Sequence, residues 1–158
     1  MLQHVRLDCR LLHGQIIMKW IKYYQANRVI VVNNAIAEDI VSQSIYRVTF
    51  PKGIRQEFLS IQSAQQILTA AEIETENERL IVFFKDIETL WWTDWAWKNC
   101  KKISFSRLPF EKDKRKLCEG FYVSDMERSL LTALKREGVS LEMRAVPTEQ
   151  SVGLNQYL

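Results

Sequence analysis

Several residue types are scarce in this chain of 158 residues, and their scarcity excludes whole classes of site. The chain has only two histidines and three cysteines, and the cysteines, Cys9, Cys100 and Cys118, are widely spaced. A structural zinc site usually includes a paired Cys-x-x-Cys, which is missing here, and a disulfide framework takes an even number of cysteines, so the sequence supports neither. We expect reduced thiols, with Cys100 and Cys118 mostly buried.

Long apolar runs and glycine-rich motifs are also missing. No apolar run approaches the roughly 20 residues that a membrane helix needs, and the first residues lack the basic and apolar regions of a signal peptide. The five glycines form neither a Gly-x-Gly-x-x-Gly motif after the first predicted strand nor a Walker lysine motif, which argues against a nucleotide-binding domain. We therefore expect a soluble, cytoplasmic protein.

The charges are nearly balanced, because 22 basic and 19 acidic residues leave a net charge of +3. Aromatic residues cluster and are not interleaved with basic ones, so the sequence carries no nucleic-acid footprint, although its mild basicity permits docking to an acidic partner. With 47% hydrophobic residues, the chain is long enough to bury a substantial core, and we expect one domain over residues 1–158.

Segments with the pattern of strands alternate with segments of helical periodicity. The predicted strands are residues 5–9, 29–32, 56–60, 80–84, 103–106, 120–123 and 140–146, and the predicted helices are residues 15–24, 38–50, 62–71, 87–99 and 125–136. This alternation is typical of βαβ units, so we predict an α/β fold: a single domain with a mainly parallel central sheet and helices on both faces. Residues 72–78 are predicted to form a surface turn, and residues 107–118 an irregular basic segment.

Two of the helices carry more detailed predictions. In residues 125–136, Ser124 and Glu127 form a capping box that satisfies the first free N–H groups of the helix. In residues 38–50, the residues at helical spacing are predicted to face inward. These residues are Ile40, Val41, Ser44, Ile45 and Val48.

The stretch at residues 6–15 reads Arg-Leu-Asp-Cys-Arg-Leu-Leu-His-Gly-Gln, and it holds the strongest candidate site. It runs from the end of a predicted strand through a short loop to a helix start. His13 can attack phosphorus and form a labile N–P bond, and Arg10 can grip two phosphoryl oxygens with its planar guanidinium. Free N–H groups at the helix start can cradle the same oxygens. The other histidine, His4, is expected to be structural.

In open parallel sheets, ligands lie beyond the carboxyl ends of the strands. This rule places the loop at residues 10–14, Asn33-Asn34 and Lys85-Asp86 along one edge of the predicted sheet. We expect the chemistry of the protein at this edge.

The pattern Arg-x-Asp-x-Arg-Leu-x-His-Gly-Gln, followed by an apolar residue and by Trp20, resembles the IIB subunit of the mannose/fructose/sorbose family of the bacterial sugar phosphotransferase system. Other landmarks fall in the family's order and extend the likeness over nearly the whole chain. They are Ala26-Asn27-Arg28 before a strand, the Pro51-x-Gly53 turn, Phe84-Lys85 at a strand end, and residues 138–148.

The resemblance implies a protein-phosphohistidine–sugar phosphotransferase. His13 would accept a phosphoryl group from the phosphohistidine of a IIA protein or domain and transfer it to a sugar during uptake through the membrane subunits IIC and IID. The chain would then be cytoplasmic and peripherally associated with the membrane transporter. No metal or organic cofactor is expected.

The same interpretation gives roles to the neighbours of His13. Arg10 and Asp8 are assigned to catalysis, and Asp8 either bonds the imidazole or caps the loop. Gly14, Gln15 and Arg6 are assigned to phosphate binding.

Two alternatives stay open. The carrier could be phosphorylated on Cys9, because other IIB families of this system use a cysteine after the first strand. The chain could instead be a divergent, non-catalytic or regulatory paralogue, because it has Asn33-Asn34 in place of the family's acidic pair and Ser106-Arg107-Leu108 in place of its Gly-Gly-Met stretch.

Two further clusters stand out in the sequence. Trp91, Trp92, Trp95 and Trp97 crowd one predicted helix. Core packing is the favoured explanation, and an exposed indole at a homodimer or partner contact is the alternative. The basic run Lys112, Lys114, Arg115 and Lys116 is predicted to be a solvated loop that could help to dock an acidic IIA surface.

Overall fold

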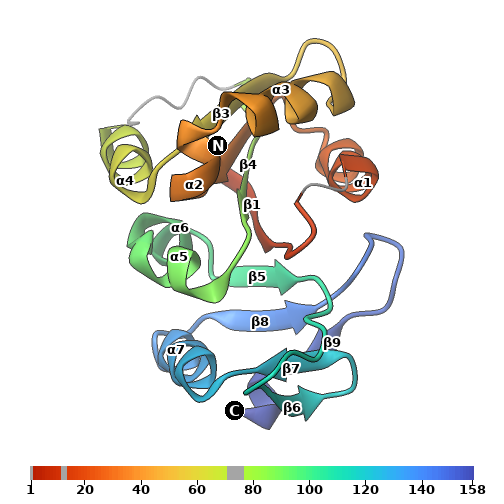
Figure 1. The fold of residues 1–158 in the computed structure, drawn as a ribbon, viewed down its shortest axis with the longest axis vertical. Coiled ribbons are helices and arrows are strands. Elements are labelled where there is room, and N and C mark those ends of the chain that lie inside the picture. Colours follow the sequence, from red (N-terminus) through yellow and green to blue (C-terminus); the bar gives the residue numbers. More distant parts are fainter. Residues whose placement is uncertain (1, 12–13, 71–76) are drawn as a thin grey trace.

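The computed structural model describes residues 2–11, 14–70 and 77–158. A central sheet of seven strands has the order β3-β2-β4-β1-β5-β8-β9 (Figure 1). The strands are β1 (Leu2–Leu7), β2 (Arg28–Val32), β3 (Arg55–Leu59), β4 (Leu80–Phe84), β5 (Lys102–Phe105), β8 (Ser140–Met143) and β9 (Val152–Gly153). All neighbours run parallel except β8 and β9, so the predicted α/β class with a mainly parallel sheet is confirmed.

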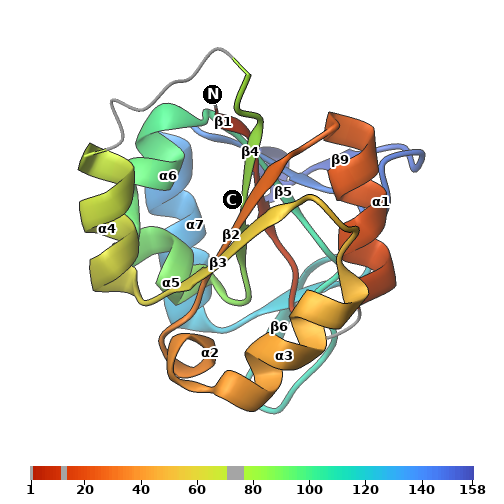
Figure 2. The same cartoon turned by 90° about the horizontal axis from the view of Figure 1, so that it is seen from above.

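Helices cover both faces of the sheet (Figure 2). One face carries α1 (Gly14–Tyr24), α2 (Asn34–Glu38) and α3 (Ile40–Thr49), and the other carries α4 (Ile61–Ala70), α5 (Ile87–Trp92), α6 (Asp94–Asn99) and α7 (Asp125–Arg136). Each layer has its own apolar core, because successive strand residues point to opposite faces: Ile30 and Val32 pack into one core, Val29 and Val31 into the other. None of the described helices has the length and apolar content to cross a membrane.

The predicted irregular segment at residues 107–118 contains a strand that the sequence did not reveal. β6 (Arg115–Cys118) pairs antiparallel with β7 (Phe121–Val123). Only Leu117 and Cys118 of β6 are buried, so the apolar signal was too short to indicate a strand. The polar tail likewise contains β9 and a 3₁₀ turn, η1 (Asn155–Tyr157), where the Asn155 side chain bonds the backbone of Val139 and Leu141.

Several predicted boundaries shift. The helix predicted over residues 87–99 is two short helices that divide at Thr93, a buried residue whose hydroxyl donates to the Thr89 carbonyl. The predicted strand at residues 140–146 ends at Met143. The helix predicted over residues 125–136 matches α7, and the Ser124–Glu127 capping box is present. Residues 71–76, which include most of the predicted surface turn, lie outside the described part of the chain.

The inward face predicted for residues 38–50 is wrong. Ile40, Val41, Ile45 and Val48 are 77%, 71%, 49% and 86% exposed. The buried residue of α3 is Tyr46, whose ring lies 5.5 Å from Phe58 of β3 and 6.1 Å from Phe50. A large aromatic ring fills the space above β3, and the helix therefore turns its aliphatic side chains outward.

Candidate functional site

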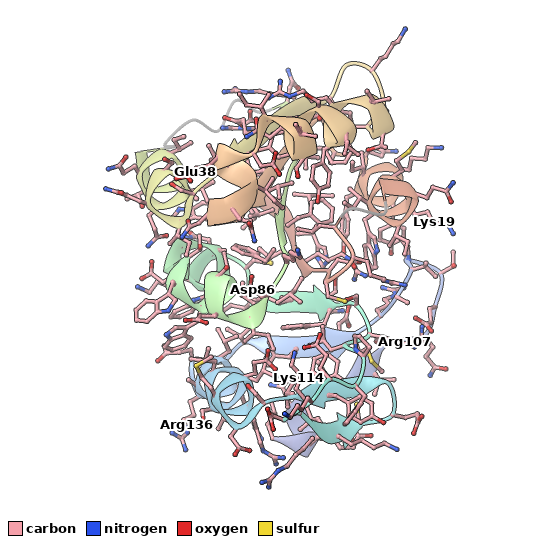
Figure 3. The ribbon with its side chains drawn as sticks, in the orientation of Figure 1. Lys19, Glu38, Asp86, Arg107, Lys114 and Arg136 are labelled. Carbon is pink, nitrogen blue, oxygen red and sulfur yellow. The ribbon has the colours of Figure 1, made fainter. Side chains whose placement is uncertain are left out.

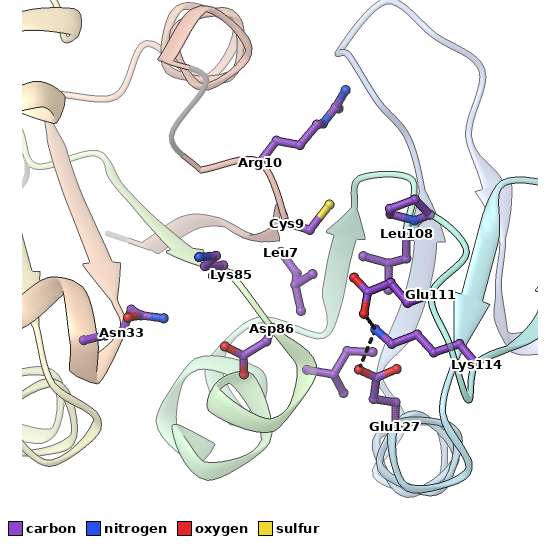
Figure 4. Close-up of a pocket in the computed structure, with 13 residues that line it drawn as sticks. Leu7, Cys9, Arg10, Asn33, Lys85, Asp86, Leu108, Glu111, Lys114 and Glu127 are labelled. Carbon is purple, nitrogen blue, oxygen red and sulfur yellow. Dashed lines mark ion pairs between the residues drawn. The ribbon is translucent and has the colours of Figure 1, made fainter. Parts of the chain in front are cut away.

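Beyond the carboxyl ends of β1 and β4, the chain turns to opposite faces of the sheet. α1 follows β1 on one face and α5 follows β4 on the other, although the two strands are hydrogen-bonded neighbours. Such a divergence opens a crevice at the switch point of a parallel sheet. A cleft of about 500 Å³ lies there and is lined by Arg10, Asn33, Lys85 and Asp86, on the edge that the sequence predicted (Figure 4).

A buried ion pair lies behind this cleft. The Nη2 nitrogen of Arg6 lies 3.0 Å from Asp8 Oδ2, and both side chains are excluded from solvent. Arg6 also donates to Ser104 Oγ and to the carbonyls of Arg144 and Ala145. One guanidinium thus ties together β1, β5 and the segment that follows β8.

This burial changes the role expected for Arg6. Burial lowers the pKa of Arg6, and the neighbouring Asp8 carboxylate opposes that shift. The guanidinium has no exposed surface from which to reach a phosphoryl group. The direct phosphate contact predicted for Arg6 is therefore replaced by a contact with Asp8.

Asp8 in turn holds the loop that leads to α1. Its Oδ1 accepts a hydrogen bond from the backbone N–H of Arg10 at 3.0 Å, and Arg10 Nε lies 3.7 Å from the same oxygen. The loop-capping role of Asp8 is therefore seen directly. The other predicted role, a bond to His13, concerns a residue outside the described part of the chain. The Arg10 side chain is 42% exposed, so its guanidinium remains open to a ligand.

The start of α1 borders a second hollow. Arg10, Gly14, Gln15 and Ile16 line this space of about 430 Å³. The first N–H groups of a helix have no partner within the helix, and they favour a bound anion. Gly14 is needed here for packing, because a Cβ atom at this position would lie 2.7 Å from Cβ of Thr49 in α3.

His4 is structural, as predicted. Its Nε2 lies 2.7 Å from Ser104 Oγ, and its ring stacks on Tyr24 at 4.6 Å and on Trp20 at 5.5 Å. Burial, followed by the positive charge of Arg6, lowers the pKa of His4 from 6.5 to about 3. The ring is therefore neutral and enclosed near neutral pH.

Cys9 lies in the middle of the cleft, between Asn33 at one end and Lys114 at the other (Figure 4). Its backbone N–H donates to Ser106 Oγ at 3.2 Å, and its Sγ donates to the Arg107 carbonyl at 3.4 Å. Ser106 therefore fixes the backbone of Cys9. The thiols of Cys9, Cys100 and Cys118 are all free. Cys118 is buried as predicted, whereas Cys100 is only half-buried.

The sequence missed one wall of the cleft. Lys114 Nζ lies 3.2 Å from Glu127 Oε1 and 3.3 Å from Glu111 Oε2, and all three side chains line the cleft (Figure 4). Burial lowers the pKa of Lys114, but its two carboxylate partners outweigh this effect and the net pKa is raised. The solvated role predicted for Lys114 is thus wrong. No signal in the sequence marked this wall, because Lys114 stands in a basic run and its partner Glu127 belongs to another element.

Asn33 and Asn34, which follow β2 at this edge of the sheet, have structural tasks. Asn33 Oδ1 accepts from the N–H of Ile36 and caps α2, while Asn34 Oδ1 accepts from the N–H of Ile61 at the start of α4. Asp86 caps α5 through the N–H of Thr89. The side-chain amides of Asn33 and Asn34 accept these hydrogen bonds without adding negative charge to the cleft.

The tryptophan cluster is mainly part of the core. Trp91 and Trp97 stack with ring centroids 5.4 Å apart, and Trp97 Nε1 donates to the Trp91 carbonyl. Trp92 is the exposed indole. Among the described residues, no group of three or more His, Cys, Asp or Glu side chains is arranged to hold a metal ion.

In Figure 3, Asp86 lies near the middle of the molecule and Lys114 lies below it, whereas Lys19 and Arg136 lie toward its outer edges. A doubly wound parallel sheet with charged side chains of both signs at its switch point, and with the exposed Arg10 beside a helix start, defines an α/β protein suited to holding an anionic group.

The family follows from comparison with known proteins. The family model described as PTS system sorbose subfamily IIB component matches residues 2–158, and the chain belongs to this family. The family supports a phosphoryl-carrier role in sugar transport by the phosphotransferase system. Its general context includes a IIA partner and membrane subunits.

Individual relatives agree with this assignment. The PTS system fructose-specific EIIB component of Bacillus subtilis is 26% identical over 153 residues, which cover 97% of this chain and 93% of that protein. The N-acetylgalactosamine-specific phosphotransferase enzyme IIB component 2 of Escherichia coli is 24% identical over 97% of this chain and 96% of its own. The crystal structure of the IIBSor domain of the sorbose permease from Klebsiella pneumoniae shares the fold, with a TM-score of 0.87 at 20% identity over 99% of this chain and 95% of that one.

Proposed function

We propose that this chain, as a single IIB domain over residues 1–158, carries a phosphoryl group on His13. His13 accepts the group from the phosphohistidine of a IIA protein or domain and transfers it to a sugar during uptake through membrane IIC and IID subunits. The observation that carries this proposal is that Arg10 and Gly14, which bracket His13 in the sequence, line one hollow with Gln15. A phosphoryl group in that hollow meets an open guanidinium and the start of a helix.

Each transfer is an in-line displacement. In the first, an imidazole nitrogen of His13 attacks phosphorus, the N–P bond to the donor breaks, and its electron pair returns to the donor imidazole. In the second, a sugar hydroxyl attacks phosphorus, the N–P bond to His13 breaks with its electron pair returning to the imidazole, and the imidazole takes up the hydroxyl proton. Arg10 and the free N–H groups of α1 stabilise the charge on the equatorial oxygens.

Asp8 and Arg6 act behind the reacting atoms. Asp8 holds the backbone of Arg10, and Arg6 holds Asp8. We assign both as positioning residues for the loop, with no direct phosphate contact for Arg6. Gln15 is exposed and Gly14 is the first residue of α1, so their backbone N–H groups supply the phosphate-binding contacts.

Cys9 supports a second candidate, because its thiol lies inside the cleft. In that case the thiolate, instead of the imidazole, forms the bond to phosphorus. In the regulatory alternative, the chain has the same cleft but does not transfer phosphate, because the residues at positions 33, 34 and 106 differ from those expected for the family.

Transfer from a phosphorylated IIA donor separates these functions. The full chain is mixed with labelled phospho-IIA, and label on the chain is measured for the natural sequence, His13→Ala and Cys9→Ser. The carrier on His13 predicts that His13→Ala takes up no label and that Cys9→Ser still does. Loss of label in Cys9→Ser alone supports the thiol, and no transfer to the natural sequence supports the regulatory alternative.

We further propose a cytoplasmic location with peripheral binding to the membrane subunits. Exposed Lys112, Arg115 and Lys116 lie in the segment that also forms one wall of the cleft, where they favour approach of an acidic IIA surface.

A further inference from the structure

A stripe of exposed apolar side chains runs along α3. Ile40, Val41, Ile45 and Val48 all lie on its outer face, and Ser44 shares that face because residues three and four apart are neighbours on a helix. We refer to these five residues as the α3 stripe. Contiguous exposed apolar patches on folded proteins commonly mark sites of association.

The opposite side of α3 is already occupied by its own chain. Tyr46 packs on Phe50 and Phe58, and the Asp39 carboxylate caps the helix through the N–H groups of Val41 and Ser42. The α3 stripe is therefore not part of the described core. None of its residues lines the cleft or the hollow at the start of α1.

We propose that the α3 stripe joins two copies of this chain about a twofold axis, with the two α3 helices antiparallel. The charges at the two ends of the helix select this arrangement. Exposed Glu38 lies just before its amino end, and exposed Lys52 lies just beyond its carboxyl end. In an antiparallel pair each acidic end meets the basic end of the other copy, whereas a parallel pair brings like charges together.

The same arrangement fits the apolar residues. A twofold axis that passes between Ser44 and Ile45 places Val41 of each copy against Val48 of the other. The dimer therefore contains this contact twice. Ser44 then lies at the crossing point, where a small side chain allows the helix axes to approach closely. The helix dipoles also oppose one another favourably.

The interface is small, because one ten-residue helix from each copy forms it. Stable interfaces usually bury about 1,200 Å² or more, so the dimer is expected to be weak and to appear in the micromolar to millimolar range. Sedimentation velocity over that range should show a monomer at low concentration and a dimer at high concentration.

Substitutions test which surface is responsible. Val48→Lys should raise the dissociation constant at least tenfold, while circular dichroism shows an unchanged fold. Trp92→Lys is the matched control, because Trp92 is a comparably exposed apolar residue on another helix, and it should leave the dimer intact. A dimer that Val48→Lys does not weaken, or that Trp92→Lys abolishes, overturns the proposal.

A charge exchange tests the antiparallel orientation. Glu38→Lys and Lys52→Glu should each weaken the dimer at low salt, and the double variant should restore it because both contacts are re-formed with opposite signs. Failure of the double variant to recover overturns this orientation.

The inference does not depend on the proposed function. Transfer of label to His13 should be unchanged in Val48→Lys, so the phosphoryl-carrier proposal can fail without affecting the dimer. A natural chain that stays monomeric at all these concentrations overturns the dimer. If Val48→Lys then also loses transfer from IIA, the α3 stripe is a surface for that different partner.

Discussion

Arg6 of β1 and Asp8, two residues further along, form an ion pair in which both side chains are buried, with Arg6 Nη2 and Asp8 Oδ2 3.0 Å apart. The second oxygen of Asp8 holds the backbone of Arg10. A buried pair of this kind is sensitive to loss of one partner, because the other charge is left in the interior without compensation. The position of Arg10 in the candidate site therefore depends on the Arg6–Asp8 ion pair, which lies out of reach of a bound ligand.

Asp8→Asn should lower the free energy of unfolding by about 3 to 5 kcal/mol, because the Arg6 charge stays buried without its carboxylate. Urea denaturation measures this change. Glu119→Gln removes an exposed partner of Lys116 and should leave stability nearly unchanged. A loss below about 1 kcal/mol for Asp8→Asn would contradict the importance of the buried pair.

Gly14→Ala should destabilise the chain by about 1 to 3 kcal/mol, because the added Cβ atom would lie 2.7 Å from Cβ of Thr49 and force α1 and α3 apart. The measurement is a double-mutant cycle with Thr49→Gly. Removing the Thr49 side chain should make Gly14→Ala nearly neutral. Additive effects of the two changes would show that the contact between α1 and α3 is not the cause.

His4 should make stability depend on pH. The unfolded chain takes up a proton near pH 6.5, but the folded chain does so only near 3, because burial and Arg6 lower the pKa of His4. The unfolded state therefore binds more protons between these values, and the free energy of unfolding falls as the pH falls through this window. At about pH 4.5 the loss from His4 alone is about 3 kcal/mol.

His4→Phe removes this titration and keeps an aromatic ring against Tyr24. Thermal unfolding of both chains from neutral pH to about pH 4.5 should show a shallower decline for His4→Phe. Parallel declines would mean that His4 is protonated in the folded chain.

Arg10→Lys should slow phosphoryl transfer to the chain about 100-fold, because an ammonium group cannot grip two phosphoryl oxygens as the planar guanidinium does. Rapid-quench measurement of label transfer from phospho-IIA gives the rate. Arg136→Lys, at the exposed carboxyl end of α7, is the control and should transfer at the normal rate. Equal rates in the two variants would place the phosphoryl group away from Arg10.

Strong local patterns in the sequence were sufficient for much of the fold. The β-branched and apolar run at residues 80–84 matches β4, and Ser124 with Glu127 fixed the start of α7. α3 shows the limit of such patterns, since periodicity gives two candidate faces and only the contact of Tyr46 with Phe58 of a distant strand decides between them. β6 was missed because its pairing with β7, and not its composition, makes it a strand.

The candidate site divides in the same way. Arg10, Asn33 and Asp86 could be placed from the rule on carboxyl ends of parallel strands. Lys114 could not, because its carboxylate partner Glu127 comes from another element, and a lysine in a basic run gives no sign of such pairing. Arg6 was misassigned because its burial depends on Ser104 and on the carbonyls of residues 144 and 145, which only the folded chain brings to it.

The most direct test of the central claim is to locate the phosphate on the chain after reaction with phospho-IIA. Mass spectrometry of peptides kept at alkaline pH should place it on His13, and brief acid treatment should release it, because an N–P bond to imidazole is acid-labile. Phosphate on Cys9 that survives acid, or no phosphate on residues 6–15 at all, would contradict the account.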